Sequence, residues 1–483
     1  MLFNSLEFFI FFPITTLLYF LIPATCRWPL LLLASCIFYM AFIPIYLSVL
    51  FFMIVVDYIA GVFIESSQGT RRRIYLIVSI FSNVGILAIF KYYTFLNNNL
   101  ALLGHFLQFE YSGPTLSLIL PLGLSFHTFQ AMSYTIEVYR GHQKAERNFG
   151  IYALYVMFYP QLVAGPIERP QNLIHQFRER HLFDYGRVTD GLRLMAWGLF
   201  KKIVIADRLA VFVNHVYAEP TGYQGIPLII ATVFFAFQIY TDFSAYSDIA
   251  IGAAKVMGFT LMQNFKSPYL SESIAEFWRR WHISLSTWFR DYVYIPLGGN
   301  RGVKRKWYFN IFVTFLLSGL WHGANWTYVV WGAMNGFFVL SSLWSMNVRS
   351  RLSHFMGFED FPKVSRCLNI LTTFCLVCFS WIFFRANSLS DALYVSTHLF
   401  SGTGRVLSTD FLLGQRVEDL VMAILAICVL CASDYILRYS DTVDMLLNKP
   451  VWFRWTAYYA LLGSILLFGK FGDEAHQFIY FQF

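Results

Sequence analysis

The sequence predicts an all-α protein that crosses a membrane about 11–12 times, counting about 20 apolar residues per crossing. Three observations lead to this fold class. Of the 483 residues, 57% are hydrophobic and only 13% are charged, whereas a soluble domain carries about 25% charged residues. The mean hydropathy is +0.54. Apolar segments recur from the first residues to the last, so the chain falls in the membrane class before any motif is considered.

The individual helices are predicted from these apolar runs. Candidate spans lie near residues 3–23, 28–43, 44–64, 74–95, 116–138, 190–216, 226–250, 307–321, 326–346, 367–384, 414–437 and 453–470. The stretches 98–109, 149–165 and 388–400 are apolar but short or broken, which is typical of re-entrant or interfacial helices. Because no long polar stretch separates the segments, we expect one membrane domain over residues 1–483.

The net charge is +8 and the pI is about 9.0, but the basic residues stand in short clusters between apolar segments. These clusters are Arg71–Arg73, Arg140–Arg147, Arg169–Arg187, Lys266–Lys306 and Arg349–Arg366. Two crossings or one re-entrant dip separate successive clusters, so all of them fall on one side, which the positive-inside rule assigns to the cytoplasm. The charge therefore points to a lipid membrane and not to nucleic acid.

The longest polar interval, about residues 259–306, combines basic residues with Trp and Phe. This composition is typical of an amphipathic segment in the headgroup layer, and equally of a plain interfacial anchor. Within it, Trp278, His282 and Ser286 share one face if the surrounding stretch is helical, with Arg279 to the side. Such a cationic, aromatic patch suits an anionic donor such as coenzyme A, and equally anionic lipid.

His322 is the second candidate. It follows a short apolar run after Lys304–Lys306, so we expect the imidazole deep in the membrane, where an ionisable side chain is costly and marks a functional candidate. Its neighbours are small or aromatic: Gly319 and Gly323 leave room for a helix, cofactor or substrate, and Trp321 and Trp326 would wall a pocket. A structural histidine that is hydrogen-bonded between helices is the alternative.

Other polar groups in apolar runs favour structural roles. Asp242 and Asp248 lie in one predicted span, and we favour the locking of helices over a polar route through the membrane. The C-x-x-C pairs that start at Cys375 and Cys428 have a zinc-like spacing, but packed thiols are the usual state inside apolar runs. We therefore predict no metal site.

These stretches together resemble the membrane-bound O-acyltransferase family, in particular its bacterial branch of alginate O-acetylation and D-alanyl transfer proteins. The resemblance is carried by Gln161–Pro170 (QLVAGPIERP), Tyr240–Gly252 (YTDFSAYSDIAIG), Phe277–Gly299, Gly319–Trp326 (GLWHGANW) and the ending Phe478–Phe483 (FIYFQF). It runs essentially end to end, with a motif-bearing core of about residues 116–346. The FIYFQF ending favours the alginate type over the D-alanyl type.

The resemblance implies a ring of helices around a thin waist, with a tunnel from a cytoplasmic donor side to an acceptor side across the membrane. It puts the near-invariant family histidine at His322 and the second polar residue of the family at His282. It also implies outward transfer of an acetyl group from a thioester, acetyl-coenzyme A, to a polysaccharide such as alginate or another cell-surface glycan. The chain would bind no cofactor and would lie in the bacterial inner membrane.

An acyl thioester is already activated, so the site must deprotonate a hydroxyl, stabilise an oxyanion and exclude water. His322 suits the role of general base toward the acceptor hydroxyl. His282 suits orientation of the donor or polarisation of the thioester carbonyl. The predicted donor-binding residues are Trp278, Arg279, Trp281 and Ser286.

No serine-esterase motif and no sizeable exocytoplasmic domain are present in the sequence. A partner is therefore expected. The resemblance implies that it is a separate periplasmic or membrane-anchored acetyltransferase that passes the acetyl group to sugar hydroxyls. Two other functions stay open. One is D-alanyl transfer to a teichoic-acid-type polymer, and the other is a transporter or flippase, which would also bury Asp and His.

Overall fold

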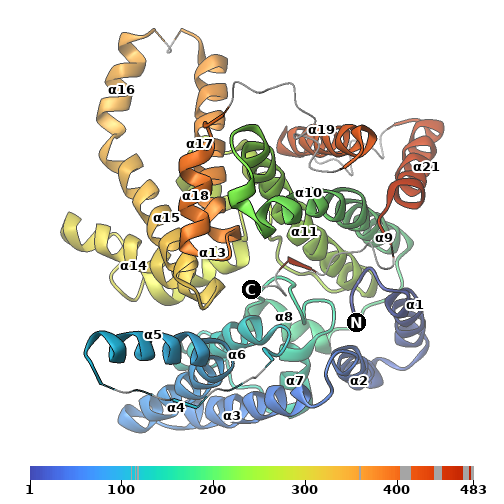
Figure 1. Ribbon diagram of the computed structural model, residues 1–483. Helices are drawn as coiled ribbons and strands as arrows, with labels where there is room; N and C mark the ends of the chain where they lie inside the picture. Colours follow the sequence, from blue (N-terminus) through green and yellow to red (C-terminus); the bar gives the residue numbers. More distant parts are fainter. Residues whose placement is uncertain are drawn as a thin grey trace. The chain divides into compact units, whose positions relative to one another are not determined.

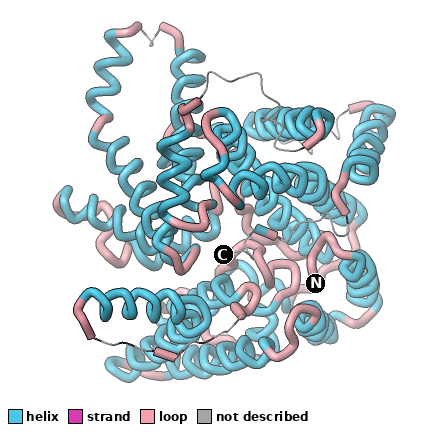
Figure 2. Tube along the Cα trace, viewed as in Figure 1, coloured by secondary structure: helices cyan, strands magenta, loops and turns pink. Residues whose placement is uncertain are grey.

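In the computed structural model the chain forms helices and connecting loops, and no strand occurs among the residues that the structure describes. Figure 2 shows this composition, with helices in cyan and loops in pink. The described residues are 1–483 except 110, 112, 115, 117–118, 358–359, 403–414, 440–448, 472–477 and 480–483. The predicted all-α fold class is confirmed.

The first of two compact units comprises Met1–Ala196 and Tyr246–Met262. Its helices are α1 (Leu6–Leu21), α2 (Arg27–Met40), α3 (Tyr46–Ser66), α4 (Gly69–Leu87), α5 (Tyr93–Phe106), α6 (Leu124–Arg140), α7 (Phe149–Met157), α8 (Pro170–Leu173) and most of α9 (Tyr185–Leu199). Helices α3, α4 and α6 pack against one another. Between α3 and α4, the buried carboxylate of Asp57 accepts hydrogen bonds from Ser79 Oγ at 2.6 Å and Asn83 Nδ2 at 2.8 Å.

The second unit comprises Trp197–Ala245 and Gln263–Phe483. Its helices are α10 (Asp207–Ala218), the first part of α11 (Ile226–Met257), α12 (Ile274–Arg280), α13 (Ile283–Phe289), α14 (Lys304–His322), α15 (Trp326–Trp344), α16 (Met346–Phe355), α17 (Pro362–Arg385), α18 (Leu389–His398), α19 (Val417–Tyr439) and α21 (Val451–Phe468). Helices α14 and α15 lie side by side, and α17 packs against α15 (Figure 1). Every predicted site residue lies in this unit.

Six helical stretches among the described residues are long and apolar enough to cross a membrane, or seven if α15 and α16, which meet at a bend of 56°, form one span. They are Tyr46–Ser66, Gly69–Phe106, Ile226–Met257, Pro362–Arg385, Val417–Arg438 and Val451–Phe468. Fewer stretches qualify than the about 11–12 crossings expected from apolar runs. Two further apolar helices, Leu6–Leu21 and Ala24–Met40, are shorter than 18 residues and account for part of the difference. The chain is a multi-pass membrane protein.

The three short apolar stretches differ in the secondary structure that they form. Residues 98–109 are not a separate dip, because a π-helical segment, Ala88–Tyr92, joins α4 to α5 in one run of 38 residues. In 149–165, the nine-residue helix α7 is followed by a buried irregular segment. In 388–400, α18 has ten residues. Both helices are too short to cross a bilayer, which needs about 20 residues.

Candidate active site

His322 is the last residue of α14, and only 5% of its surface is exposed. Its imidazole contacts three aromatic rings, with centroid distances of 4.9 Å to Trp321, 5.1 Å to Trp331 and 5.3 Å to Phe384. These rings belong to α14, α15 and α17. The histidine therefore stands at a helix end inside an aromatic enclosure, where little water competes for its nitrogens.

Gly319 allows the close approach of α14 to α15. A Cβ at this position would lie 2.3 Å from the carbonyl oxygen of Tyr328 and 2.9 Å from Gly332 Cα. A Cβ at Gly323 would lie 2.1 Å from the Tyr328 ring. The room predicted at the two glycines is thus filled by α15, and this contact sets the register between His322 and the α15 side chains.

His282 has a left-handed backbone conformation, with φ 44° and ψ 57°, between two short helices. The stretch is not one helix, because α12 ends at Arg280, Trp281 is extended, and α13 begins at Ile283. The condition for a shared helical face of Trp278, His282 and Ser286 is therefore not met. The left-handed conformation costs roughly 1–2 kcal/mol in a residue other than glycine, and such strain concentrates at functional sites. His282 is 1% exposed, so the break delivers the imidazole into the protein interior.

Asn264, which the sequence analysis missed, holds this break. Its main-chain oxygen accepts a hydrogen bond from the Ile283 N–H at 2.9 Å, and its side-chain oxygen accepts one from Ser284 Oγ at 2.7 Å. The His282 carbonyl oxygen then accepts from the Ser286 N–H at 2.9 Å, which starts α13. The partners of Asn264 are 19 and 20 residues away, and a lone Asn in the sequence carries no signal for that contact.

The interval 259–306 is therefore not a headgroup-layer segment throughout. Trp281, Ser284, Leu285 and Trp288 are buried, whereas most of residues 295–306 are exposed. The basic and aromatic composition predicted a surface position because it does not show which aromatic side chains point inward. Only the last part of the interval fits an interfacial segment.

Burial lowers the pKa of His282 from 6.5 to about 3, and this residue lies outside the six candidate spans. The imidazole is neutral at physiological pH, so one ring nitrogen is a donor and the other an acceptor. The Phe243 ring packs edge-on against it, with a centroid distance of 4.6 Å and an interplanar angle of 87°. A neutral imidazole in this apolar setting can orient a polar substrate group without the cost of a buried charge.

The two histidines belong to one cluster, because the Trp321 ring contacts both. Its centroid lies 4.9 Å from that of His322 and 6.4 Å from that of His282. Trp321 is 5% exposed, whereas Trp326, the other residue predicted to wall the pocket, is 50% exposed. Of the two tryptophans, only Trp321 contributes to the buried wall.

The four predicted donor-binding residues occupy different positions. Trp278 contacts Trp331 at a centroid distance of 5.6 Å and so joins the rings around His322. Trp281 is buried, and its carbonyl oxygen accepts a hydrogen bond from Ser286 Oγ at 3.1 Å. Arg279 is exposed on α12. The tertiary structure therefore joins Trp278 most directly to the His322 cluster.

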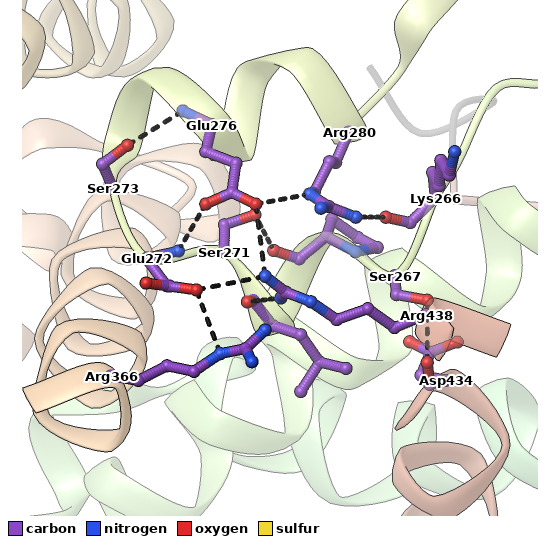
Figure 3. A network of polar contacts seen from close by, with 12 residues as sticks. Lys266, Ser267, Ser271, Glu272, Ser273, Glu276, Arg280, Arg366, Asp434 and Arg438 are labelled. Carbon is purple, nitrogen blue, oxygen red and sulfur yellow. Dashed lines mark hydrogen bonds and ion pairs between the residues drawn. The ribbon is translucent and has the colours of Figure 1, made fainter. Parts of the chain in front are cut away.

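Helix α12 is held in place by ion pairs to two other helices (Figure 3). The Glu272 carboxylate lies 3.0 Å from Arg366 of α17 and 3.2 Å from Arg438 of α19. The Glu276 carboxylate pairs with Arg280 at 2.8 Å and with Arg438 at 3.5 Å. Helices α17 and α19 thus fix α12, which leads directly into the His282 break.

The start of α12 is capped within the same network. Ser273 Oγ accepts a hydrogen bond from the Glu276 N–H at 3.2 Å, and the Glu276 carboxylate accepts one from the Glu272 N–H at 2.8 Å. Partial burial opposes ionisation of Glu276, but the Glu272 N–H and Arg280 together hold its pKa below the ordinary value. The carboxylate therefore stays charged, and this S-x-x-E pattern is a sequence signal for the helix start.

The buried contacts of Asp242 support the structural role predicted for it. Lys202 Nζ lies 2.9 Å from Asp242 and 2.7 Å from Asp207, and all three side chains are buried. Paired charges are the form in which ionised groups are tolerated inside a protein. The described part of the chain contains no group of three His, Cys, Asp or Glu side chains that could hold a metal ion.

Only part of the C-terminal motif lies among the described residues. Phe478 and Ile479 are 3% and 1% exposed, and residues 480–483 of the motif lie outside the described part. The Phe478 ring lies 6.0 Å from Phe243, which in turn contacts His282. The start of the motif therefore packs behind the second histidine.

The two histidines are buried at helix ends and enclosed by aromatic rings, a setting that suits proton transfer away from bulk water. A membrane-embedded transferase needs a site of this kind. Residues 145–383 match the model of the MBOAT, or membrane-bound O-acyltransferase, family. The matched region includes His282, His322 and all four predicted donor-binding residues.

Curated relatives extend the match beyond this region. The chain is 40% identical over 436 residues to the probable alginate O-acetylase AlgI of Pseudomonas aeruginosa, covering 88% of this chain and 81% of the relative. It is 34% identical over 541 residues to the peptidoglycan O-acetyltransferase of Helicobacter pylori, covering 100% and 98%. The teichoic acid D-alanyltransferase of Streptococcus thermophilus is 28% identical over 288 residues, covering 56% and 69%.

The chain belongs to the membrane-bound O-acyltransferase family. It is accordingly an O-acyltransferase. The greater likeness to the O-acetylating relatives than to the D-alanyltransferase confirms the preference that the C-terminal motif indicated.

Proposed function

We propose that this protein is an O-acetyltransferase of the bacterial cytoplasmic membrane that supplies acetyl groups for O-acetylation of an extracytoplasmic polysaccharide. The relatives named for alginate and for peptidoglycan acetylation support an acetyl group and a cell-surface glycan. The proposed donor is acetyl-coenzyme A on the cytoplasmic side. The observation that carries the proposal is the cluster in which Trp321 contacts both buried histidines.

In the proposed reaction, His322 accepts the proton of the acceptor hydroxyl while the hydroxyl oxygen attacks the thioester carbon. The tetrahedral intermediate then collapses, the carbon–sulfur bond breaks, and the proton passes from the imidazolium to the leaving thiolate. The products are an O-acetyl ester and the free thiol, so charge and protons balance. A positioned histidine base typically contributes about 10²–10⁴-fold to such a step.

His282 has a supporting role in this scheme. Its burial keeps the imidazole neutral, which suits a hydrogen bond to the donor and not charge stabilisation. Trp278, in contact with Trp331, would pack against the donor near the thioester. Arg279 is exposed on α12. Its guanidinium would bind the donor phosphates at the cytoplasmic face.

A separate partner completes the proposed pathway. The acetyl group would pass from this protein to a periplasmic or membrane-anchored acetyltransferase that acts on the sugar hydroxyls. Purified chain that acetylates polymer efficiently without any second protein would contradict this part of the proposal.

The deciding experiment follows radiolabelled acetyl groups in membrane vesicles that contain this protein, its polysaccharide and the candidate partner. Incorporation from acetyl-coenzyme A that is lost in His322→Ala supports the proposal. Incorporation from a D-alanyl thioester in place of acetyl-coenzyme A would assign D-alanyl transfer. Coupled solute flux in proteoliposomes without any acetylated product would instead identify a transporter.

A further inference from the structure

A buried indole N–H next to His322 has no acceptor among the described residues. Trp331 of α15 is 1% exposed, and its Nε1 has no hydrogen-bond partner among the residues that the structure describes. Buried polar groups in folded proteins are nearly always hydrogen-bonded, so each exception calls for an explanation, and a catalytic role is one of them. The Trp331 ring stands edge-on to the His322 imidazole, at 5.1 Å and 87°.

The position of this donor matches a need of the proposed reaction. A general base lies about 3 Å from the hydroxyl oxygen whose proton it removes, and the attacked carbonyl is in contact with that oxygen. The negative charge that develops on the carbonyl oxygen therefore forms close to His322. Catalysis of acyl transfer requires hydrogen-bond donors aimed at that oxygen.

Several main-chain and cationic donors near His322 are already engaged. At the start of α15, the Thr327 N–H is bound to the Asn325 side chain at 3.1 Å, and the Tyr328 N–H to the Asn325 carbonyl at 3.1 Å. The guanidinium of Arg385, which follows Phe384 in α17, donates to Asn214 at 2.9 Å. These three donors, which are of the kinds that often supply an oxyanion hole, are thus committed to the fold.

We propose that the Trp331 indole N–H donates a hydrogen bond to the acyl carbonyl oxygen of the substrate and stabilises the oxyanion formed beside His322. This inference rests on the proposed acyl transfer and deepens it. Trp278 contacts Trp331 at 5.6 Å, and its buried Nε1 also has no partner among the described residues. It is placed to supply a second donor to the same oxygen.

The packing around Trp331 explains why its indole can act as the hydrogen-bond donor to the oxyanion. Trp381 of α17 stacks on Trp331 at 5.7 Å and 18°, and Phe384 packs against it at 5.1 Å and 67°. These contacts hold the indole in one orientation, and a preorganised donor needs no rearrangement when charge develops. The close contact between Gly319 and Gly332, next to Trp331 in the chain, fixes the ring against His322.

The test replaces Trp331 with benzothienylalanine, which keeps the shape of the side chain but has sulfur in place of the N–H. We expect kcat for acetyl transfer to fall about 10²–10³-fold, as for the loss of one oxyanion-hole donor, with KM for acetyl-coenzyme A unchanged. The matched control makes the same replacement at Trp288 of α13, which is also buried but packs against Phe289 and Tyr292. It should transfer at a rate close to that of the wild type.

A wild-type rate in the Trp331 isostere would overturn the inference, as would an equal loss at both tryptophans. If the isostere does not fold, fluorinated tryptophans at position 331 replace it, because they alter N–H acidity and keep the fold. A transfer rate that changes with N–H acidity supports the inference. A transfer rate that is independent of N–H acidity refutes the inference. A wild-type protein that transfers no acetyl group would instead defeat the proposed function.

Discussion

The main-chain N–H of Ile479 donates a hydrogen bond to the carboxylate of Asp242 at 2.7 Å, across 237 residues of sequence. Lys202 completes the site by bridging Asp242 and Asp207. The neighbouring Phe243 contacts both the His282 imidazole and Phe478. A buried ion pair therefore fixes the C-terminal segment behind the second histidine.

Removing the Asp242 carboxylate should destabilise the protein strongly. Asp242→Ala removes one carboxylate partner of Lys202 and the acceptor of the Ile479 N–H, and breaking a buried pair typically costs about 3–5 kcal/mol. Thermal unfolding in detergent measures the loss. The matched control is Asp190→Ala, whose partners Arg193 and Lys255 are partly exposed and which should cost about 0–1 kcal/mol. Equal losses in the two variants would contradict the structural role of Asp242.

Loss of the His322 imidazole should remove transfer and leave the fold intact. His322→Ala is expected to lower the rate by about 10²–10⁴-fold, the range typical of a positioned base. Radiolabelled acetyl transfer in vesicles measures the effect, with size-exclusion chromatography as the check on folding. The control is His105→Ala, which removes an exposed histidine at the end of α5. A folded His322→Ala protein with near-normal transfer would reject His322 as the base.

The left-handed conformation of His282 predicts that two substitutions will differ in stability but not in activity. The backbone φ at position 282 is 44°. Glycine adopts this angle readily, whereas alanine has the same backbone strain as histidine. We expect His282→Gly to be more stable than His282→Ala by about 1 kcal/mol, even after the greater flexibility of glycine in the unfolded chain is counted. Both should lose donor binding and transfer. Unchanged affinity for acetyl-coenzyme A in both variants would exclude the donor-orienting role.

The buried neutral state of His282 predicts a stability that falls in acid. Its pKa is lowered from 6.5 to about 3 in the folded state, so the unfolded chain binds the proton more readily between these values. The contribution of His282 is therefore fully present above pH 6.5 and is lost as the pH falls toward 3. At pH 5 the loss from this one residue amounts to about 2 kcal/mol. His282→Gln should flatten the pH dependence of the unfolding temperature, and an unchanged pH dependence in this variant would contradict the prediction.

Gly319 should tolerate no side chain. In Gly319→Ala the added Cβ would meet the Tyr328 carbonyl and Gly332, and overpacking of this kind costs typically about 1–3 kcal/mol. Transfer should fall as well, because α14 shifts against α15 and moves His322 away from Trp331. The control is Gly463→Ala in α21, where a Cβ has nothing within 4 Å and helix propensity improves. A Gly319→Ala variant as stable and active as this control would refute the close-packing argument.

Much of the candidate site could be predicted from the sequence. His322 is a recognisable candidate because a histidine between glycines in an apolar run is costly without a function. The family resemblance then identifies both histidines as expected site residues. Other parts could not be predicted. The break at His282 depends on Asn264, whose hydrogen bonds reach Ile283 and Ser284, and the aromatic composition around Trp278 fits a surface anchor as well as a buried wall.

The sequence by itself determined that this protein is an all-α, multi-pass membrane protein of the O-acyltransferase family, because apolar composition and long motifs are properties of the chain alone. The tertiary structure decided how the two histidines meet. Trp321 contacts both imidazoles, and Trp331 and Phe384 enclose His322 from two other helices. Contacts of this kind depend on how closely glycines let helices pack and on which distant side chains meet, and no local pattern encodes either.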